Sequence, residues 1–265
     1  MESELMYGID AMLIAAALLV ALLLVIELGY RVGRAHERKE STAAKAHLTA
    51  IQASMLGILA LLLGFTFSSA LQRFDVRSDA VVAEANAIGT AWQRTGLLPD
   101  RHRAEARAAL RAYLDVRIVA NDVTMDQYKG RAALQVETLR AQARLWDVAR
   151  RAALAHPDPV TTGLHAEAVN ALTDAYILRN AALDRHVPEV VLFLLMATFL
   201  MTGLVVGFAT GVAGDRPSLA SHVMVALIAV LVFIILDLDR PRRGLVLVDH
   251  GSLLELRAQV SRPAD

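Results

Sequence analysis

The chain of 265 residues is more apolar than a soluble domain, because 55% of its residues are hydrophobic and only 20% are charged. Part of it is therefore expected to lie in a membrane. The 27 basic and 27 acidic side chains cancel, so the net charge gives no indication of nucleic-acid binding. The sequence contains no cysteine, which excludes disulfides and thiolate chemistry.

Four windows carry the apolar excess, and each is close to the roughly 20 residues that cross a hydrocarbon core about 30 Å thick. They cover residues 11–30, 50–71, 187–213 and 219–238. Acidic rather than basic residues precede the first window, and it is longer than the apolar core of a secretory signal, so we expect it to stay in the membrane. The predicted fold class is an all-α integral membrane protein with four transmembrane helices.

Residues 72–186 are rich in Ala, Arg, Leu and Asp, with apolar residues recurring at three and four positions. This pattern predicts an extramembrane bundle of three or four antiparallel helices, in which membrane helices can be prolonged. Pro99 and Asp100 mark one helix start, and Asp158 before Pro159 predicts an N-cap with a first-turn proline. The predicted parts of the chain are residues 1–71, 72–186, 187–238 and a tail, 239–265.

Counting the crossings puts the N-terminus, the 72–186 domain and the tail on one side of the membrane. The linkers 31–49 and 214–218 then lie on the other side. Basic residues are almost equally divided between the two sides, so the positive-inside rule leaves the orientation open. Giving most weight to the first helix favours an external N-terminus.

Three glycines in the third apolar window are spaced four residues apart: Gly203, Gly207 and Gly211. That spacing places them on one helix face, where another backbone can approach closely. We therefore predict tight helix packing there, against a partner in the same chain or in another copy. Glycine is also common in membrane helices that lack such packing.

A polar stripe runs along the second window and beyond it, since Thr66, Ser69, Arg73, Arg77 and Glu84 recur at helical spacing. Two arginines four residues apart repel each other and need acidic partners or an anion. The segment LDLDRPRRG, which ends the fourth window, returns to the same membrane face. The stripe is predicted either to form a charge network there or to line a path for ions. The network residues would be Arg73, Asp75, Arg77, Glu84, Asp237, Asp239 and Arg240.

Phe65 and Phe67, with Thr66 and Ser69 beside them, are the candidate residues for a pore lining or an apolar constriction. Phenylalanine in a membrane helix is more often a packing or lipid contact. The catalytic motifs HExxH, GxxxxGK[ST] and GxSxG are absent, and the eight histidines lack metal-ligand spacing. We therefore predict no enzyme activity, no metal site and no cofactor.

Three segments together resemble the bestrophin-like domain family of bacterial membrane proteins: LLGFTFSSALQRFDVRSDAVVAEANAIGTAW, VPEVVLFLL and LDLDRPRRGLVLVDHGSLLEL. The resemblance covers nearly the whole chain in order. The residues that match the family motif are Arg73, Asp75, Arg77, Glu84, Asn86, Asp239, Arg240, Pro241 and Gly244.

The resemblance implies a homo-oligomeric pore in the bacterial inner membrane, lined by the second membrane helix, with Phe65 and Phe67 near a neck. A more distant similarity to bestrophins implies a pentamer that conducts anions, with the N-terminus, the 72–186 domain and the tail in the cytosol. That orientation conflicts with the charges around the first helix. The tail has no acidic cluster like the calcium clasp of bestrophins. Expected partners are the lipid bilayer, further copies of the chain and an inorganic ion, with no nucleic acid.

The alternative function is a structural or signalling membrane protein whose helical domain docks a soluble partner. A transporter is a third reading. It would need ionisable groups near the middle of the bilayer, and the four windows contain none except Glu27, near the end of a span.

Overall fold

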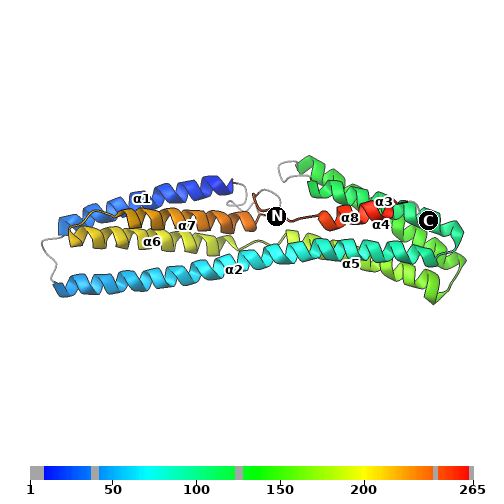
Figure 1. Ribbon diagram of the computed structural model, residues 1–265, viewed down its shortest axis with the longest axis horizontal. Coiled ribbons are helices and arrows are strands. Elements are labelled where there is room, and N and C mark those ends of the chain that lie inside the picture. The colour runs from blue at the N-terminus through cyan, green and yellow to red at the C-terminus, as the bar shows by residue number, and fades with distance from the viewer. Residues whose placement is uncertain (1–8, 37–41, 123–127, 241–243, 263–265) are drawn as a thin grey trace. The chain divides into compact units, whose positions relative to one another are not determined.

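The computed structural model describes residues 9–36, 42–122, 128–240 and 244–262, and over these residues it contains helices and no strands. The all-α fold class is therefore confirmed (Figure 1). The helices are α1 (Ala11–His36), α2 (Thr42–Arg94), α3 (Asp100–Asp122), α4 (Tyr128–Ala155), α5 (Leu164–Leu183), α6 (Glu189–Ala213), α7 (Leu219–Leu238) and α8 (Gly251–Val260). A 3₁₀ turn, η3 (Thr95–Leu97), follows α2, and a π-helical turn, η4 (Pro159–Gly163), precedes α5.

The chain forms two compact units. The first, which we call the membrane unit, comprises Met1–Arg73 and His186–Arg240. The second, the helical unit, comprises Phe74–Arg185 and Pro241–Asp265. Helix α2 is continuous from Thr42 to Arg94, so it contributes its first part to the membrane unit and its second part to the helical unit.

Among the described residues, four helices are long and apolar enough to cross a membrane: α1, α2, α6 and α7. Helix α1 packs against both α6 and α7. The core of this unit consists of aliphatic side chains, such as Leu22 and Val232, and the buried ring of Phe199. Branched and aromatic side chains interdigitate there, which suits helices that have no polar face.

Glycines set the distance between α1 and α6. A Cβ added at Gly207 or Gly211 would lie well within 3.0 Å of backbone atoms of α1, and one added at Gly29 or Gly33 would lie equally close to backbone atoms of α6. At Gly203 the nearest atoms belong to side chains of α1. The glycine face of α6 thus packs within the same chain, against a second pair of glycines that the sequence analysis did not single out.

The helical unit is organised around α3, whose apolar positions are buried against the second part of α2 and against α4 and α5. Tyr113, Leu145, Leu172 and Ile88 are each at most 1% exposed. Helix α8 belongs to this core through Leu253, which is fully buried. One apolar face of α3 is buried along its length: Ala106, Leu110, Tyr113, Leu114 and Ile118.

Hydrogen bonds hold the end of α8 and the turn before α5 in the helical unit. Arg111 of α3 donates two hydrogen bonds, at 2.9 and 3.2 Å, to the carbonyl oxygen of Val260 at the end of α8. Before α5, the Asp158 side chain accepts a hydrogen bond from the Val160 backbone N–H, with Pro159 in the first turn. That turn is π-helical rather than the α-helical start that the sequence pattern predicts, and the Thr162 hydroxyl donates to the carbonyl oxygens of the segment before it.

Candidate functional site

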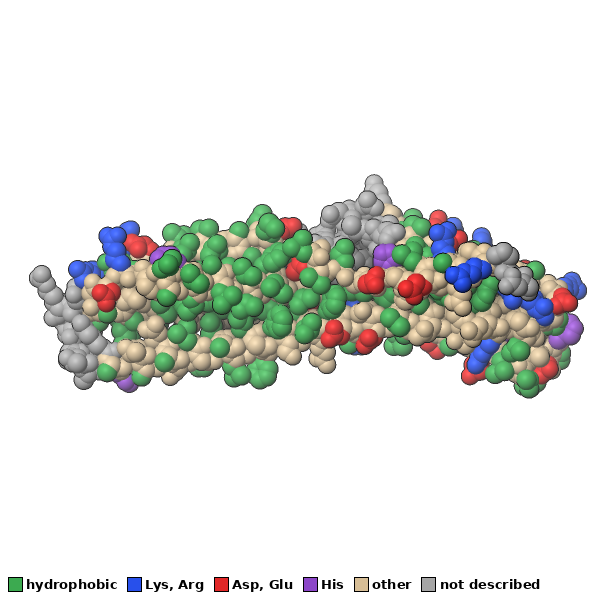
Figure 2. Space-filling model, viewed as in Figure 1, with side chains coloured by type: hydrophobic (Ala, Val, Ile, Leu, Met, Phe, Trp, Pro, Cys, Tyr) green, Lys and Arg blue, Asp and Glu red, His purple; other side chains and the backbone are tan. Residues whose placement is uncertain are grey.

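The apolar part of α2 is far more exposed than the other candidate membrane helices. Only 6% of its most apolar window is buried in the chain, against 33% in α1, 39% in α6 and 28% in α7. Figure 2 shows the apolar side chains that cover the surface of the membrane unit. Helix α2 therefore presents most of its apolar surface to something other than its own chain.

The candidate residues of α2 divide between two faces. Phe65 is 67% exposed, on the same side as Ile58 and Leu61, whereas Phe67 is half-buried. Thr66 is buried, and its hydroxyl donates to the carbonyl oxygen of Leu62 within the helix. The two phenylalanines are two residues apart, about 200° around a helix, so they do not share a face.

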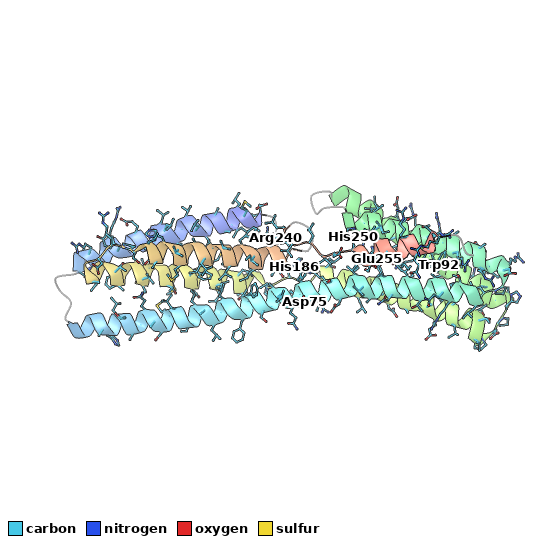
Figure 3. All side chains as sticks on the ribbon, in the orientation of Figure 1. Asp75, Trp92, His186, Arg240, His250 and Glu255 are labelled. Atoms are coloured by element: carbon cyan, nitrogen blue, oxygen red, sulfur yellow. The ribbon has the colours of Figure 1, made fainter. Side chains whose placement is uncertain are left out.

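The exposed face of α2 turns polar beyond its apolar part. Ser68, Gln72, Asp75 and Asp79 follow Phe65 at spacings of three and four, and all four are exposed. Asp75 and Asp79 make no hydrogen bond or ion pair with any residue that the structure describes. Figure 3 shows Asp75 extending from α2. The charges that this face offers to its surroundings are therefore acidic.

The two arginines of the stripe are directed into the protein. Arg73 is half-buried and donates to both the carbonyl oxygen and the hydroxyl oxygen of Ser69. Arg77 is 1% exposed and donates to the carbonyl oxygens of Ala182 and Arg185, at 3.2 and 2.6 Å. These carbonyls lie at the C-terminal end of α5, where the helix dipole favours a cation. Arg77 is thus a helix cap in the helical unit.

The LDLDR segment is buried at the end of α7, where Asp237, Asp239 and Arg240 are each at most 5% exposed. Asp239 accepts a hydrogen bond of 2.9 Å from the Val187 backbone N–H, and its carboxylate lies 3.9 Å from Nδ1 of His186. Arg240 donates to the carbonyl oxygen of Ile9, just before α1. Figure 3 labels His186 and Arg240 at this junction. Asp239 and Arg240 therefore join the end of α7 to the starts of α6 and α1.

The remaining family-motif positions of the LDLDRPRRG segment are Pro241 and Gly244. Pro241 lies outside the described residues. Gly244 lies inside them, in a bend, and is half-buried.

Glu84 lies in the core of the helical unit, where its side chain is fully buried. Its Oε1 accepts hydrogen bonds from Nε of Arg117 at 2.5 Å and from the Tyr113 hydroxyl at 3.0 Å. Its Oε2 accepts from Arg117 and Arg179. Burial alone would raise the pKa of Glu84, but the two arginines outweigh it and hold this pKa below its usual value. The carboxylate is thus charged and fully paired in the core.

The sequence pattern did not predict the partners of Glu84. Arg117 sits among the apolar residues of the buried face of α3, and its guanidinium lies 4.8 Å from the ring centre of Tyr176. Arg179 sits in the same way on the buried face of α5. A charged residue on an otherwise apolar helix face is the signal that would have indicated a buried ion pair.

The chain was compared with known protein families. The family model of the bestrophin-like domain matches residues 15–253, which is most of the chain. The chain belongs to the bestrophin-like family. No curated protein matches this bestrophin-like chain.

Solved structures share the fold of this bestrophin-like chain at low sequence identity. A crystal structure of a bestrophin homologue from Klebsiella pneumoniae, carrying one substitution, superposes with a TM-score of 0.67 at 16% identity, over 92% of this chain and 96% of that one. Another variant of it gives 0.63 at 16% identity, over 91% and 96%. A structure described as a membrane protein gives 0.65 at 14% identity, over 92% and 97%. These likenesses support the fold.

The junction at Asp239 gives a first testable prediction. Replacing Asp239 with alanine leaves the buried Val187 N–H without its acceptor, and we expect a loss of about 2 kcal/mol in the free energy of unfolding. Thermal unfolding in detergent measures it. Asp215→Ala, at an exposed carboxylate in the linker before α7, is the control and should leave the melting temperature unchanged. Equal melting temperatures for the two variants would show that Asp239 does not hold the start of α6.

Proposed function

We propose that this bestrophin-like chain forms a homo-oligomeric ion channel, with the exposed face of α2 lining the pore. The observation that carries the proposal is the low burial of α2 within its own chain, only 6% over its most apolar window. Other copies of the chain would supply the missing contacts. Family membership supports a channel rather than an enzyme, and a pentamer is the assembly that the distant resemblance to bestrophins implies.

The exposed face of α2 changes from apolar to polar side chains along the helix, and this change supports a pore better than a lipid-facing surface. Lipid would accept Ile58, Leu61 and Phe65, but the same face continues with Ser68 and the residues beyond it. A row of exposed polar side chains that begins next to an apolar ring suits a water-filled path with an apolar constriction. In this proposal Phe65 forms the constriction, and Phe67 packs inside the chain.

We further propose that the channel prefers cations. The exposed charges on the proposed lining are the carboxylates of Asp75 and Asp79. Arg73 and Arg77 instead donate hydrogen bonds to groups inside the protein. In an oligomer each aspartate becomes a ring of acidic groups, which attracts cations and repels anions. The proposal thus departs from the anion channel that the resemblance to bestrophins implies.

Recordings from reconstituted protein in a planar bilayer under asymmetric KCl test both statements. We expect a conductance whose reversal potential lies toward the equilibrium potential of K⁺. Asp75→Asn combined with Asp79→Asn should move the reversal potential toward zero, because the acidic rings are removed. Glu167→Gln, at an exposed carboxylate on α5, is the matched control and should change nothing.

Two different results would contradict the channel and the cation preference. A bilayer that stays silent with several salts contradicts the channel itself. A conductance that reverses near the equilibrium potential of Cl⁻ supports the channel and contradicts the cation preference.

A further inference from the structure

A buried histidine at one end of the helical unit is the strongest feature that the proposed channel does not use. His165 lies in the first turn of α5 and is 1% exposed. Its Nδ1 atom is buried and has no hydrogen-bond partner among the described residues. Arg94, the last residue of α2, donates a hydrogen bond of 2.8 Å to the carbonyl oxygen of the neighbouring Leu164 and reaches Glu167 at 3.3 Å. The imidazole is therefore enclosed beside a fixed guanidinium.

Three physical effects oppose a proton on this imidazole. Burial removes the water that would solvate the charged form. Arg94 places a like charge nearby, and the N-terminal end of α5 carries the positive end of the helix dipole. Burial first, and Arg94 second, lower the pKa of His165 to about 4.

The other charged groups on the neighbouring elements do not change the pKa of His165. Helices α2 and α4 and the turn η4 surround the start of α5. The titratable residues at the adjoining ends of these elements are Arg94, His156, Asp158 and Glu167, with Asp147, Arg150 and Arg151 toward the end of α4. The last three pair with one another and with Glu105 on α3, and Asp158 caps η4. Of all these groups, Arg94 alone shifts the pKa of His165.

We propose that the junction between the end of α2 and the start of α5 is an acid-sensitive switch, which opens when His165 takes up a proton. Opening would bring the imidazole into water and break the hydrogen bond from Arg94 to Leu164. The inference concerns the helical unit and holds whether or not the chain conducts ions.

The direction of the pH dependence follows from the two states of His165. In the open state the imidazole has its ordinary pKa of about 6.5. In the closed state its pKa is lowered to about 4. The closed form is thus fully stable above pH 6.5 and loses stability as the pH falls toward 4, because the open form binds the proton more tightly. Between pH 7 and pH 5 the ratio of open to closed forms should rise roughly 20-fold.

Trp92 provides a reporter close to the switch, because it lies on the last turns of α2, within 5.2 Å of the guanidinium of Arg107 and 5.0 Å of that of Arg111. Figure 3 labels it. Trp146 is the second tryptophan of the sequence and is 45% exposed, so Trp146→Phe gives a single-tryptophan background in the full chain.

Two measurements on that background, in detergent, test the switch. Amide hydrogen exchange in residues 159–170, corrected for the intrinsic rate, should show an opening that rises about 20-fold from pH 7 to pH 5. Trp92 fluorescence should change reversibly over the same range. His165→Gln should abolish both responses, and Arg94→Gln should reduce them, since it removes the neighbouring charge. His156→Gln, at an exposed histidine before η4, should leave them unchanged.

Two results would overturn the proposal. One is a helical unit whose exchange at residues 159–170 is the same at pH 7 and pH 5. The other is an acid response that persists in a folded His165→Gln variant, or that persists in full in Arg94→Gln where the first variant fails to fold.

Discussion

Replacing Glu84 with alanine is expected to lower the free energy of unfolding by about 3–5 kcal/mol, because two arginines would remain in the core without their counter-ion. Arg117 and Arg179 are each less than 5% exposed, and both donate hydrogen bonds to this carboxylate. The hydroxyl of Tyr113 would lose its acceptor as well. Thermal unfolding in detergent, followed by circular dichroism, measures the loss as a lower melting temperature.

The matched control for Glu84 is Glu167→Ala, which removes another carboxylate that pairs with an arginine. The side chain of Glu167 is 69% exposed, so the loss should stay below about 1 kcal/mol. The same melting temperature in both variants would show that the buried cluster does not stabilise the helical unit.

Acid affects Glu84 in a different pH range from His165. Its pKa is lowered in the folded protein, so the stability that it contributes is complete above its ordinary value of 4.5 and is lost as the pH falls through the lowered value. The response assigned to His165 begins near pH 6.5, well above that range. The two contributions can therefore be separated by titration.

A methyl group at Gly207 should force α1 and α6 apart. The added Cβ would meet the backbone of Ile26 well within 3.0 Å, and backbone atoms cannot move aside as a side-chain end can. We expect Gly207→Ala to cost about 3 kcal/mol, at the upper end of what overpacking costs in a core. Thermal unfolding of the purified protein in detergent measures it.

Gly64→Ala is the control for Gly207. A Cβ at Gly64 meets nothing within 4 Å in the chain. Because alanine favours a helix more than glycine, this variant should be neutral or up to about 1 kcal/mol more stable. A Gly207→Ala variant that is as stable as Gly64→Ala would contradict the close packing of α1 on α6.

The sequence was sufficient to predict the helices because their signals are local. Apolar windows of membrane length contain α6, α7 and most of α1, which continues to His36. The expectation that membrane helices can be prolonged agrees with an α2 that continues to Arg94. The π-helical turn before α5 was not predicted, because it depends on hydrogen bonds from Thr162 to two carbonyl groups rather than on the Asp-Pro pair alone.

The candidate site was predictable as a stripe but not as a set of contacts. Periodicity places Arg77 and Glu84 on one face of α2, and both are buried. Glu84 pairs with residues of α3 and α5, and Arg77 donates to carbonyl groups at the end of α5, so nothing local to α2 identifies these contacts. Gly29 and Gly33 are the opposite case, since their four-residue spacing is visible in the sequence and matches that of the glycines they face.

The absence of cysteine from the sequence permits the most direct test of the proposed pore. Ser68→Cys places one thiol on the exposed face of α2, whereas Ala70→Cys places it on the buried face, where the native side chain is fully buried. Leu24→Cys, on an exposed position of α1, is a third site outside the proposed lining. A charged, membrane-impermeant thiol reagent is then added to an oligomer conducting in a planar bilayer. We expect the current to fall in Ser68→Cys and to stay constant in the other two variants. A current that the reagent leaves unchanged in Ser68→Cys, although mass spectrometry shows the thiol modified, would contradict a pore lined by α2.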